Sequence, residues 1–142
     1  MTMDEIVNHI IDLAERIGKY WERVLPTLPG YPNIPSSELV KYDPKEKDEL
    51  LQFLIGLGKD EFEFVLALKN FAGRYLRLNQ FAAELESIRS KQMNRQMMAG
   101  ELVYMGRIVS YDLLQALKRL RYHGITLDQL QTPDRVPTLS AV

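Results

Sequence analysis

Apolar residues recur at every third or fourth position along the first part of the chain. The repeating set is Ile6, Ile10, Leu13, Ile17, Trp21 and Val24. This period matches an α-helix with a single apolar face. Thr2 can cap such a helix, and Glu5 three residues later completes the pattern of a capping box. Pro26 ends the pattern because proline lacks the N–H group that a helix interior needs, so we predict one amphipathic helix between Thr2 and Pro26.

The next segment, residues 26–42, is rich in proline. Prolines stand at every third position, at Pro26, Pro29, Pro32 and Pro35. Because proline fixes φ and donates no hydrogen bond, neither a helix nor a central strand is expected here. The segment also contains Leu28, Tyr31 and Ile34. We therefore expect a loop that packs across the helices instead of a free linker.

A second helix is predicted to start after Asp43. Asp43 is a good cap, Pro44 suits the first helical position and Glu46 suits the third. The apolar residues of this helix are Leu50, Leu51, Phe53 and Leu54. Its end is expected near Gly56 or Gly58.

The longest apolar pattern follows a group of acidic residues that begins at Asp60. Its apolar positions alternate steps of four and three, at Phe64, Leu68, Phe71, Tyr75, Leu78, Ala82 and Leu85. A 3.5-residue repeat of this kind is typical of a helix that packs lengthwise on another helix. We therefore predict one long helix over residues 60–96, which Gly73 could kink.

The C-terminal part of the chain shows a weaker apolar pattern, and its helices are predicted chiefly from capping residues. Residues 101–109 fit either a short helix or an extended segment. Ser110 can cap the helix that follows it, and Gly124 fits the position just past the end of that helix. Thr126 and Gln129 form a second capping box, which predicts a further short helix.

Together these patterns predict an all-α fold with a single helical domain over residues 1–130. We expect a bundle of four to five main helices, in which one helix is long and central. The proline-rich loop of residues 26–42 is expected to pack across that central helix. Residues 131–142 are polar, contain two prolines and are predicted to form a flexible tail.

The composition narrows the class of protein. Of the 142 residues, 46% are hydrophobic and 26% are charged, which is the balance of a globular domain. Cysteine is absent, which excludes disulfides, thiolate metal sites and cysteine nucleophiles. The first residues carry acids where a secretory signal carries positive charge, and no apolar run approaches the ~20 residues that span a bilayer. We therefore expect a cytoplasmic protein that does not enter a membrane.

The sequence contains no motif that commits the chain to a reaction or a cofactor. Glu5, His9 and Asp12 fall on one face of the first helix and could offer metal ligands. Arg16 and Arg23 share that face, so a ladder of exposed charge pairs is favoured over a bound cation. We therefore expect no enzyme activity, no cofactor and no metal, since an enzyme would need a partner to enclose this face.

Charge is divided unevenly along the chain. Residues 1–68 hold 7 Lys/Arg and 13 Asp/Glu, a net charge of −6, whereas residues 69–123 hold 10 Lys/Arg and 4 Asp/Glu, a net charge of +6. Such a basic half can bind a polyanion, or it can attract the acidic half within one fold. The candidate nucleic-acid-binding residues are Arg74, Arg77, Arg89, Lys91, Arg95, Lys118, Arg119 and Arg121.

Apolar residues outside the repeat of the long helix indicate a second kind of surface. A helix that is apolar on most sides is either deeply buried or shared between chains, and methionines adapt to varied contacts. The candidate docking residues are Phe62, Leu66, Leu76, Phe81, Met93, Met97 and Met98. We expect foremost a non-catalytic adaptor or subunit that docks onto a protein partner or a second copy of itself, and that could belong to a nucleoprotein assembly. The alternative is a nucleic-acid-binding protein that uses the basic face of residues 74–95 and 118–121.

Overall fold

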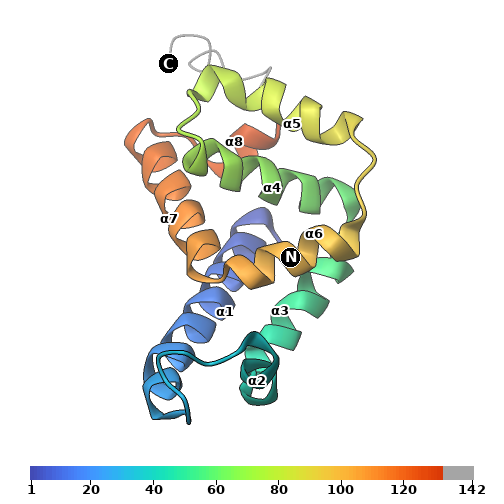
Figure 1. The fold of residues 1–142 in the computed structure, drawn as a ribbon. Coiled ribbons are helices and arrows are strands. Elements are labelled where there is room, and N and C mark those ends of the chain that lie inside the picture. The colour runs from blue at the N-terminus through green and yellow to red at the C-terminus, as the bar shows by residue number, and fades with distance from the viewer. Residues whose placement is uncertain (133–142) are drawn as a thin grey trace.

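The computed structural model describes residues 1–132, which form helices joined by short turns, with no strand among them (Figure 1). The helices are α1 (Met3–Val24), α2 (Ser36–Leu39), α3 (Lys45–Gly56), α4 (Lys59–Gly73), α5 (Phe81–Ser90), α6 (Arg95–Met105), α7 (Arg107–Tyr122) and α8 (Leu127–Gln131). Short 3-10 turns lie between them at η1 (Leu25–Thr27), η2 (Val40–Tyr42) and η3 (Leu78–Gln80). In the described part of the chain, no helix has both the length and the hydropathy that a membrane crossing requires.

The all-α prediction is confirmed, but the number of main helices is larger than predicted. Six of the helices within residues 1–132 have ten or more residues, instead of four or five. The predicted tail of residues 131–142 lies outside the described residues from residue 133 onward.

Helix α1 forms as the sequence predicts. The Glu5 carboxylate accepts a hydrogen bond from the Thr2 amide (2.9 Å), and the Thr2 hydroxyl accepts one from the Glu5 amide (3.1 Å). The hydrogen bonds from the amide and the hydroxyl of Thr2 hold the pKa of Glu5 below its usual value. The apolar face from Ile6 to Ile17 is buried, and α1 packs against α3 and α7.

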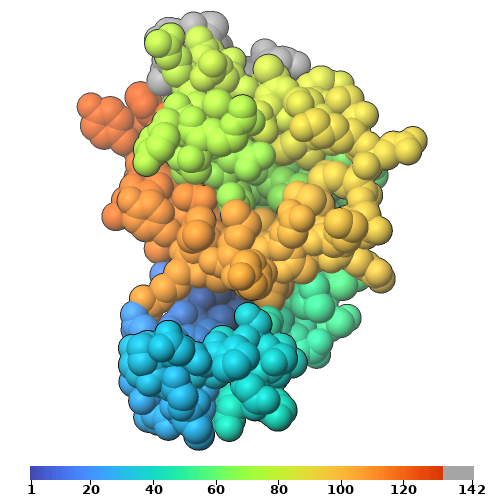
Figure 2. All heavy atoms as spheres, in the orientation of Figure 1, coloured from blue at the N-terminus to red at the C-terminus, as the bar shows by residue number. Residues whose placement is uncertain are grey.

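The proline-rich segment lies at one end of the molecule. With η1, α2 and η2, it joins the C-terminal end of α1 to the N-terminal end of α3 and forms a lobe below the main body (Figures 1 and 2). The Tyr20 hydroxyl donates a hydrogen bond to the Tyr42 carbonyl, and Leu28 is buried, whereas Tyr31 is half exposed. The turn at Gly30, where φ is 87°, folds the segment back on itself. The loop therefore covers one end of α1 and α3. The prediction that it packs across a central helix is wrong.

The prediction of one long helix over residues 60–96 is wrong, because the chain reverses direction after Gly73. Helix α4 ends in a Schellman motif, in which the Leu76 amide donates to the Phe71 carbonyl (2.9 Å) and the Tyr75 amide donates to the Ala72 carbonyl (3.1 Å). Tyr75 adopts the left-handed conformation with φ of 53°, and the residue is 89% exposed. It therefore ends the helix instead of filling an apolar repeat.

Helix α5 runs back along α4 and covers its aromatic face. The Phe81 ring lies edge-on to two rings of α4, with centroids 5.5 Å from Phe64 and 6.1 Å from Phe71. Leu78 and Leu85, from the second half of the predicted repeat, are buried as well. A 3.5-residue repeat indicates that an apolar helix face is covered by another helix. It does not distinguish one long helix from two shorter helices that fold back and cover each other.

A short loop and a glycine turn divide the region after α5. Asn94 caps α6, because its side chain accepts a hydrogen bond from a backbone amide of the first turn (3.1 Å). Gly106, with φ of 53°, then turns the chain into α7, which begins at Arg107. The predicted helix start at Ser110 is wrong, since the Ser110 hydroxyl bonds to the Arg107 carbonyl (3.0 Å) inside the helix.

The end of α7 agrees with the sequence. Gly124 has φ of 67°, and the Ile125 amide donates to the Leu120 carbonyl (2.9 Å), which makes a second Schellman motif. Thr126 and Gln129 form the predicted capping box at the start of α8. Gly124 and Tyr75 thus occupy the same position, with positive φ, in two copies of one motif. Glycine adopts this conformation without a steric penalty, whereas tyrosine does not.

Helix α4 is flanked by the elements that form the surfaces described below. It packs against α5 and α7, whereas α6 packs chiefly against α3. In Figure 1, α5 and α6 run on the two sides of α4 and are joined by the loop of residues 91–94. Helix α4 is therefore largely covered, with residues 62–68 buried and Lys69 and Asn70 partly exposed.

Tyr75→Gly should raise the free energy of unfolding by about 1 kcal/mol, because glycine adopts positive φ without the steric penalty of a Cβ atom. Little packing is lost, since Tyr75 is exposed. Gly124→Ala is the matched control and should lower the free energy of unfolding by about 1 kcal/mol for the opposite reason. Urea denaturation midpoints measure both effects. An unchanged or lower midpoint for Tyr75→Gly would contradict the assignment of strain to this residue.

Candidate functional site

Helices α4, α5 and α6 enclose a groove of about 370 Å³, which we call the methionine groove. In the space-filling view, α4 atoms lie deep between α5 above and α6 below (Figure 2). The apolar lining residues are Leu66, Ile88, Met93, Met98, Leu102 and Met105. Charged residues line the same groove at Lys69, Arg74, Glu84, Lys91 and Glu101.

The polar end of the methionine groove is held by a network of ion pairs and hydrogen bonds. Glu84 of α5 accepts from the Asn70 side chain and from the Arg74 guanidinium, each at 3.0 Å. Lys69 reaches Asp112 of α7 at 3.4 Å, and their side chains are only 12% and 11% exposed. These contacts tie α4 to both neighbours, so this end of the groove is well defined.

Helix α6 is apolar on more sides than its packing requires. Leu102 and Val103 are buried, and Met98 and Met105 are partly buried at the methionine groove. Outside the core, residue Met97 is 64% exposed and Tyr104 is 88% exposed. Apolar side chains of α6 therefore face solvent as well as the core, and a group of exposed apolar side chains is typical of a surface that another chain covers.

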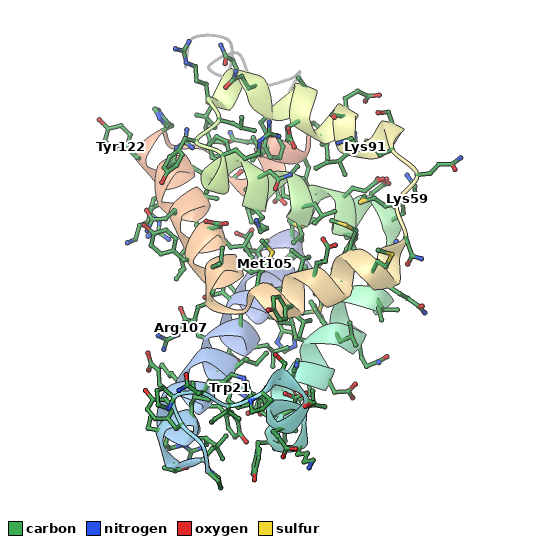
Figure 3. The ribbon with its side chains drawn as sticks, in the orientation of Figure 1. Trp21, Lys59, Lys91, Met105, Arg107 and Tyr122 are labelled. Carbon is green, nitrogen blue, oxygen red and sulfur yellow. The ribbon has the colours of Figure 1, made fainter. Side chains whose placement is uncertain are left out.

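A second hollow of about 470 Å³ lies on the other side of α6, against α1 and the proline-rich lobe. Its lining includes the aromatic residues Trp21 and Tyr104, together with Met105 and Arg107 (Figure 3). Arg107 crosses α1 at Gly18, where a Cβ atom would clash with the Arg107 side chain, and its guanidinium pairs with Glu22. Both flanks of α6 are therefore hollowed and partly apolar.

The candidate docking residues fall into two groups. Phe62 and Phe81 belong to the core with exposures of 1% and 0%, so they cannot form a docking surface for a protein partner. Leu76 is partly buried beside the core. By contrast, Met93 and Met98 are partly buried and line the methionine groove, whose floor includes the buried Leu66, and Met97 is exposed on α6.

The candidate basic residues do not form one face, because the chain reversal separates them. Arg74 and Arg77 lie at the turn between α4 and α5, close to the last turns of α7 that carry Lys118, Arg119 and Arg121. Arg89, Lys91 and Arg95 instead lie at the other end of α5, where they line a pocket together with Lys59.

Two of these arginines bind backbone carbonyl groups. The Arg119 guanidinium donates to the carbonyls of Phe71 (3.2 Å) and Leu76 (2.6 Å), and it lies 3.9 Å from the Phe71 ring centroid. Burial lowers the pKa of Arg119 from its usual value, but an arginine remains charged at neutral pH. Arg95 donates in the same way to the carbonyls of Ile55 (3.2 Å) and Leu57. Both side chains thus join segments that are distant in sequence.

The basic half of the chain is not neutralised by the acidic half. Among the described residues, Arg107–Glu22 is the single ion pair that joins residues 1–68 to residues 69–123. The remaining ion pairs of this part form within one half or the other. Five cations of the second half are exposed and paired with no acid of the described residues: Arg77, Arg89, Lys91, Lys118 and Arg121.

The face of Glu5, His9 and Asp12 shows the charge pairing and capping that the sequence favours. Glu5 belongs to the capping box, and Asp12 pairs with Arg16 at 3.1 Å. The His9 ring packs edge-on against Phe53, with centroids 4.5 Å apart. Within residues 1–132, no three His, Cys, Asp or Glu side chains come together as a metal site.

Comparison of the chain with protein-family models, with curated proteins and with solved structures finds no match. Function is therefore inferred from the surfaces themselves. The pocket at Lys59 and the hollow at Trp21 were missed in the sequence, because each is lined by segments that only the tertiary fold brings together.

Arg119→Met should lower the free energy of unfolding by about 2–3 kcal/mol, because it leaves two carbonyl groups without their charged donor. Arg121→Met is the matched control, since this neighbouring arginine is exposed, and it should change stability by less than about 0.5 kcal/mol. Chemical denaturation of the two variants measures the difference. Equal stabilities would show that Arg119 does not hold the turn.

Proposed function

We propose that this protein is a non-catalytic docking module that binds an amphipathic helix of a protein partner in the methionine groove. The observation that carries the proposal is the composition of α6, which is apolar toward α3, toward the groove and at the exposed residues Met97 and Tyr104. Internal packing alone would require only the first of these sides to be apolar. Apolar residues on the other two sides are typical of a surface that another chain covers.

The shape of the methionine groove suits a helix as its occupant. Helix α4 forms the floor, and α5 and α6 run along its two sides (Figure 1), so a further helix between them would complete a bundle. Three methionines, Met93, Met98 and Met105, line the groove. Their flexible and polarisable side chains can adjust to the residues of a partner.

The charged residues of the groove would set the direction of the bound helix. The Arg74–Glu84 ion pair and Lys69 lie at the polar end, whereas Lys91 lies where α5 joins α6. A partner helix would place apolar residues at i, i+3 or i+4 and i+7 against the floor, and its polar side toward solvent. Exposed charge pairs add little affinity, but they favour one orientation over the other.

Photocrosslinking from position 97 tests the docking proposal. A photoreactive phenylalanine derivative in place of Met97 should form a defined adduct in cells, because Met97 is exposed and directly precedes Met98, which lines the groove. The crosslinked partner peptide should carry the apolar spacing of an amphipathic helix. Met98→Glu in the same chain should reduce the adduct by about tenfold or more, since it places a charge against the apolar surface of the bound helix.

The control for this experiment places the same photoreactive residue at Asp12, on the exposed face of α1. Circular dichroism of Met98→Glu separates loss of binding from loss of fold. An adduct that forms equally from both positions, or that survives Met98→Glu, would rule out the methionine groove. The mass of the adduct shows whether the partner is a second copy of the chain, which would contradict binding to another protein.

A second candidate function, nucleic-acid binding, is favoured by the surface at the end of α7. Tyr75 and Tyr122 are 89% and 87% exposed, and Tyr122 projects away from the body (Figure 3). The cations Arg77, Lys118 and Arg121 are exposed on the same two segments, which the contact between Arg119 and the Leu76 carbonyl holds together. Exposed aromatic rings beside cations are typical of surfaces that bind single-stranded nucleic acid by stacking and charge.

Lys118→Gln with Arg121→Gln should weaken binding of a labelled single-stranded oligonucleotide by about tenfold, because two phosphate contacts are lost. The slope of log K against log salt should fall by about 1.4, since each contact with a single strand contributes about 0.7. Fluorescence anisotropy over a salt series measures both. Lys19→Gln with Lys45→Gln removes the same charge elsewhere and should leave binding unchanged. An equal loss of oligonucleotide affinity in the two double variants would show that only the net charge of the protein matters, and would contradict a site at the end of α7.

A further inference from the structure

A pocket of about 370 Å³ lies where the start of α4, the end of α5 and the loop into α6 meet. Lys59 and Lys91 border it on the side of the molecule away from α7 (Figure 3). The remaining lining residues that matter here are Phe62, Glu63, Arg89 and Arg95. A hollow of this size is within the range of small-molecule sites, which is about 300–1,000 Å³.

Cations dominate the lining of this pocket. Lys59, Arg89, Lys91 and Arg95 contribute four positive charges, against the single carboxylate of Glu63. Arg89 and Lys91 are exposed and take part in no ion pair with any residue of the described chain. The pocket therefore has a positive potential that the protein itself does not balance.

Two further groups around the pocket are fixed in place. The Arg95 guanidinium donates to the carbonyls of Ile55 and Leu57 and lies 5.0 Å from the Phe62 ring centroid, so its charge is held at the wall. The nearby acid Glu61 is bound to the Gly58 amide at 2.8 Å and does not line the pocket. Arg95 is thus held in place at the wall, and the carboxylate of Glu61 is bound at the start of α4.

Glu63 is the unusual member of the set, because it is 2% exposed among these cations. Its Oε2 atom is 2.9 Å from the Lys59 ammonium, but its Oε1 atom receives no hydrogen bond from any residue that the structure describes. A buried acceptor without a donor costs about 1–3 kcal/mol. A structure normally retains such a group only when something else satisfies it.

We infer that this pocket binds a small phosphate monoester that also carries a hydroxyl or amino group. Arg89 and Lys91 would hold the phosphate, for which arginine and lysine are well suited. The hydroxyl or amino group of the ligand would donate to the Glu63 carboxylate and supply the missing hydrogen bond. Because Oε1 is closed to solvent, the Glu63 side chain would shift to present this oxygen to the donor of the ligand, while the exposed Lys59 ammonium keeps its contact with Oε2.

This inference is independent of helix docking, although Lys91 and Met93 line both hollows. Two common sources fit the same chemistry, a nucleoside monophosphate and a sugar phosphate. In the first, the base or the ribose supplies the donor, and in the second a sugar hydroxyl does. Both kinds of ligand carry the same phosphate group. A comparison of ligands with and without a hydrogen-bond donor therefore separates binding of the phosphate by the cations from binding of the donor by Glu63.

Calorimetric titration of the full chain with adenosine monophosphate, ribose 5-phosphate and phenyl phosphate tests the site. Phenyl phosphate is a monoester without a hydroxyl or amino group on its organic part. The donor-bearing ligands should bind about tenfold more tightly than phenyl phosphate, by roughly the free energy of one hydrogen bond to a charged group. Tighter binding of adenosine monophosphate than of ribose 5-phosphate assigns the donor to the base, and equal binding assigns it to the sugar; either result supports the site.

Three variants locate the binding. Arg89→Gln with Lys91→Gln should weaken all three monoesters by about tenfold or more, whereas Lys19→Gln with Lys45→Gln should not. Glu63→Gln should abolish the advantage of the donor-bearing ligands and leave phenyl phosphate bound at least as tightly, because Lys59 is then released. The first pair of residues is exposed, so that variant should fold even if Glu63→Gln does not. Absence of binding by every monoester, equal binding of all three by the unmodified chain, or affinities that ignore Arg89 and Lys91 would each overturn the inference.

Discussion

The reversal of the chain after Gly73 is the constraint on which the rest of this structure depends. The Arg119 guanidinium binds the carbonyls of Phe71 and Leu76 and so holds the end of α4, the turn and α7 together. Asp112 of the same helix approaches α4 at Gly73, where a Cβ atom would lie 2.8 Å from its carboxylate. The reversal lets α5 cover the aromatic face of α4, so the apolar repeat of this region is satisfied within one chain.

The same reversal decides where the positive charge of the second half lies. A straight helix would have placed the arginines and lysines of residues 74–95 along one rod. The hairpin instead sends Arg77 to the end of α7 and brings Arg89 and Lys91 to the start of α4. Each group of cations thereby gains a different neighbour, exposed tyrosines at one end and a buried carboxylate at the other. The two groups of cations therefore lie in different surroundings.

Helix α6 is bordered by a hollow on each of two sides, the methionine groove and the hollow at Trp21. It packs chiefly on α3, so the side toward α4 and α5 remains open as the methionine groove. The loop that precedes α6 forms a wall of that groove and of the basic pocket, through Lys91 and Met93. The proposed sites for a partner helix and for a small anion therefore share residues of one short segment.

The sequence by itself determined what depends on residues close together in the chain. The capping boxes at Thr2 and Thr126, the apolar face of α1 and the turn at Gly124 rest on contacts across at most five residues. Only the tertiary structure decided the reversal at Gly73, the role of Arg119 and the pocket around Glu63. These features depend on groups far apart in sequence, such as Arg119 and the Phe71 carbonyl 48 residues away. Local periodicity reports which face of a helix is covered, but the covering segment is chosen by packing among distant parts of the chain.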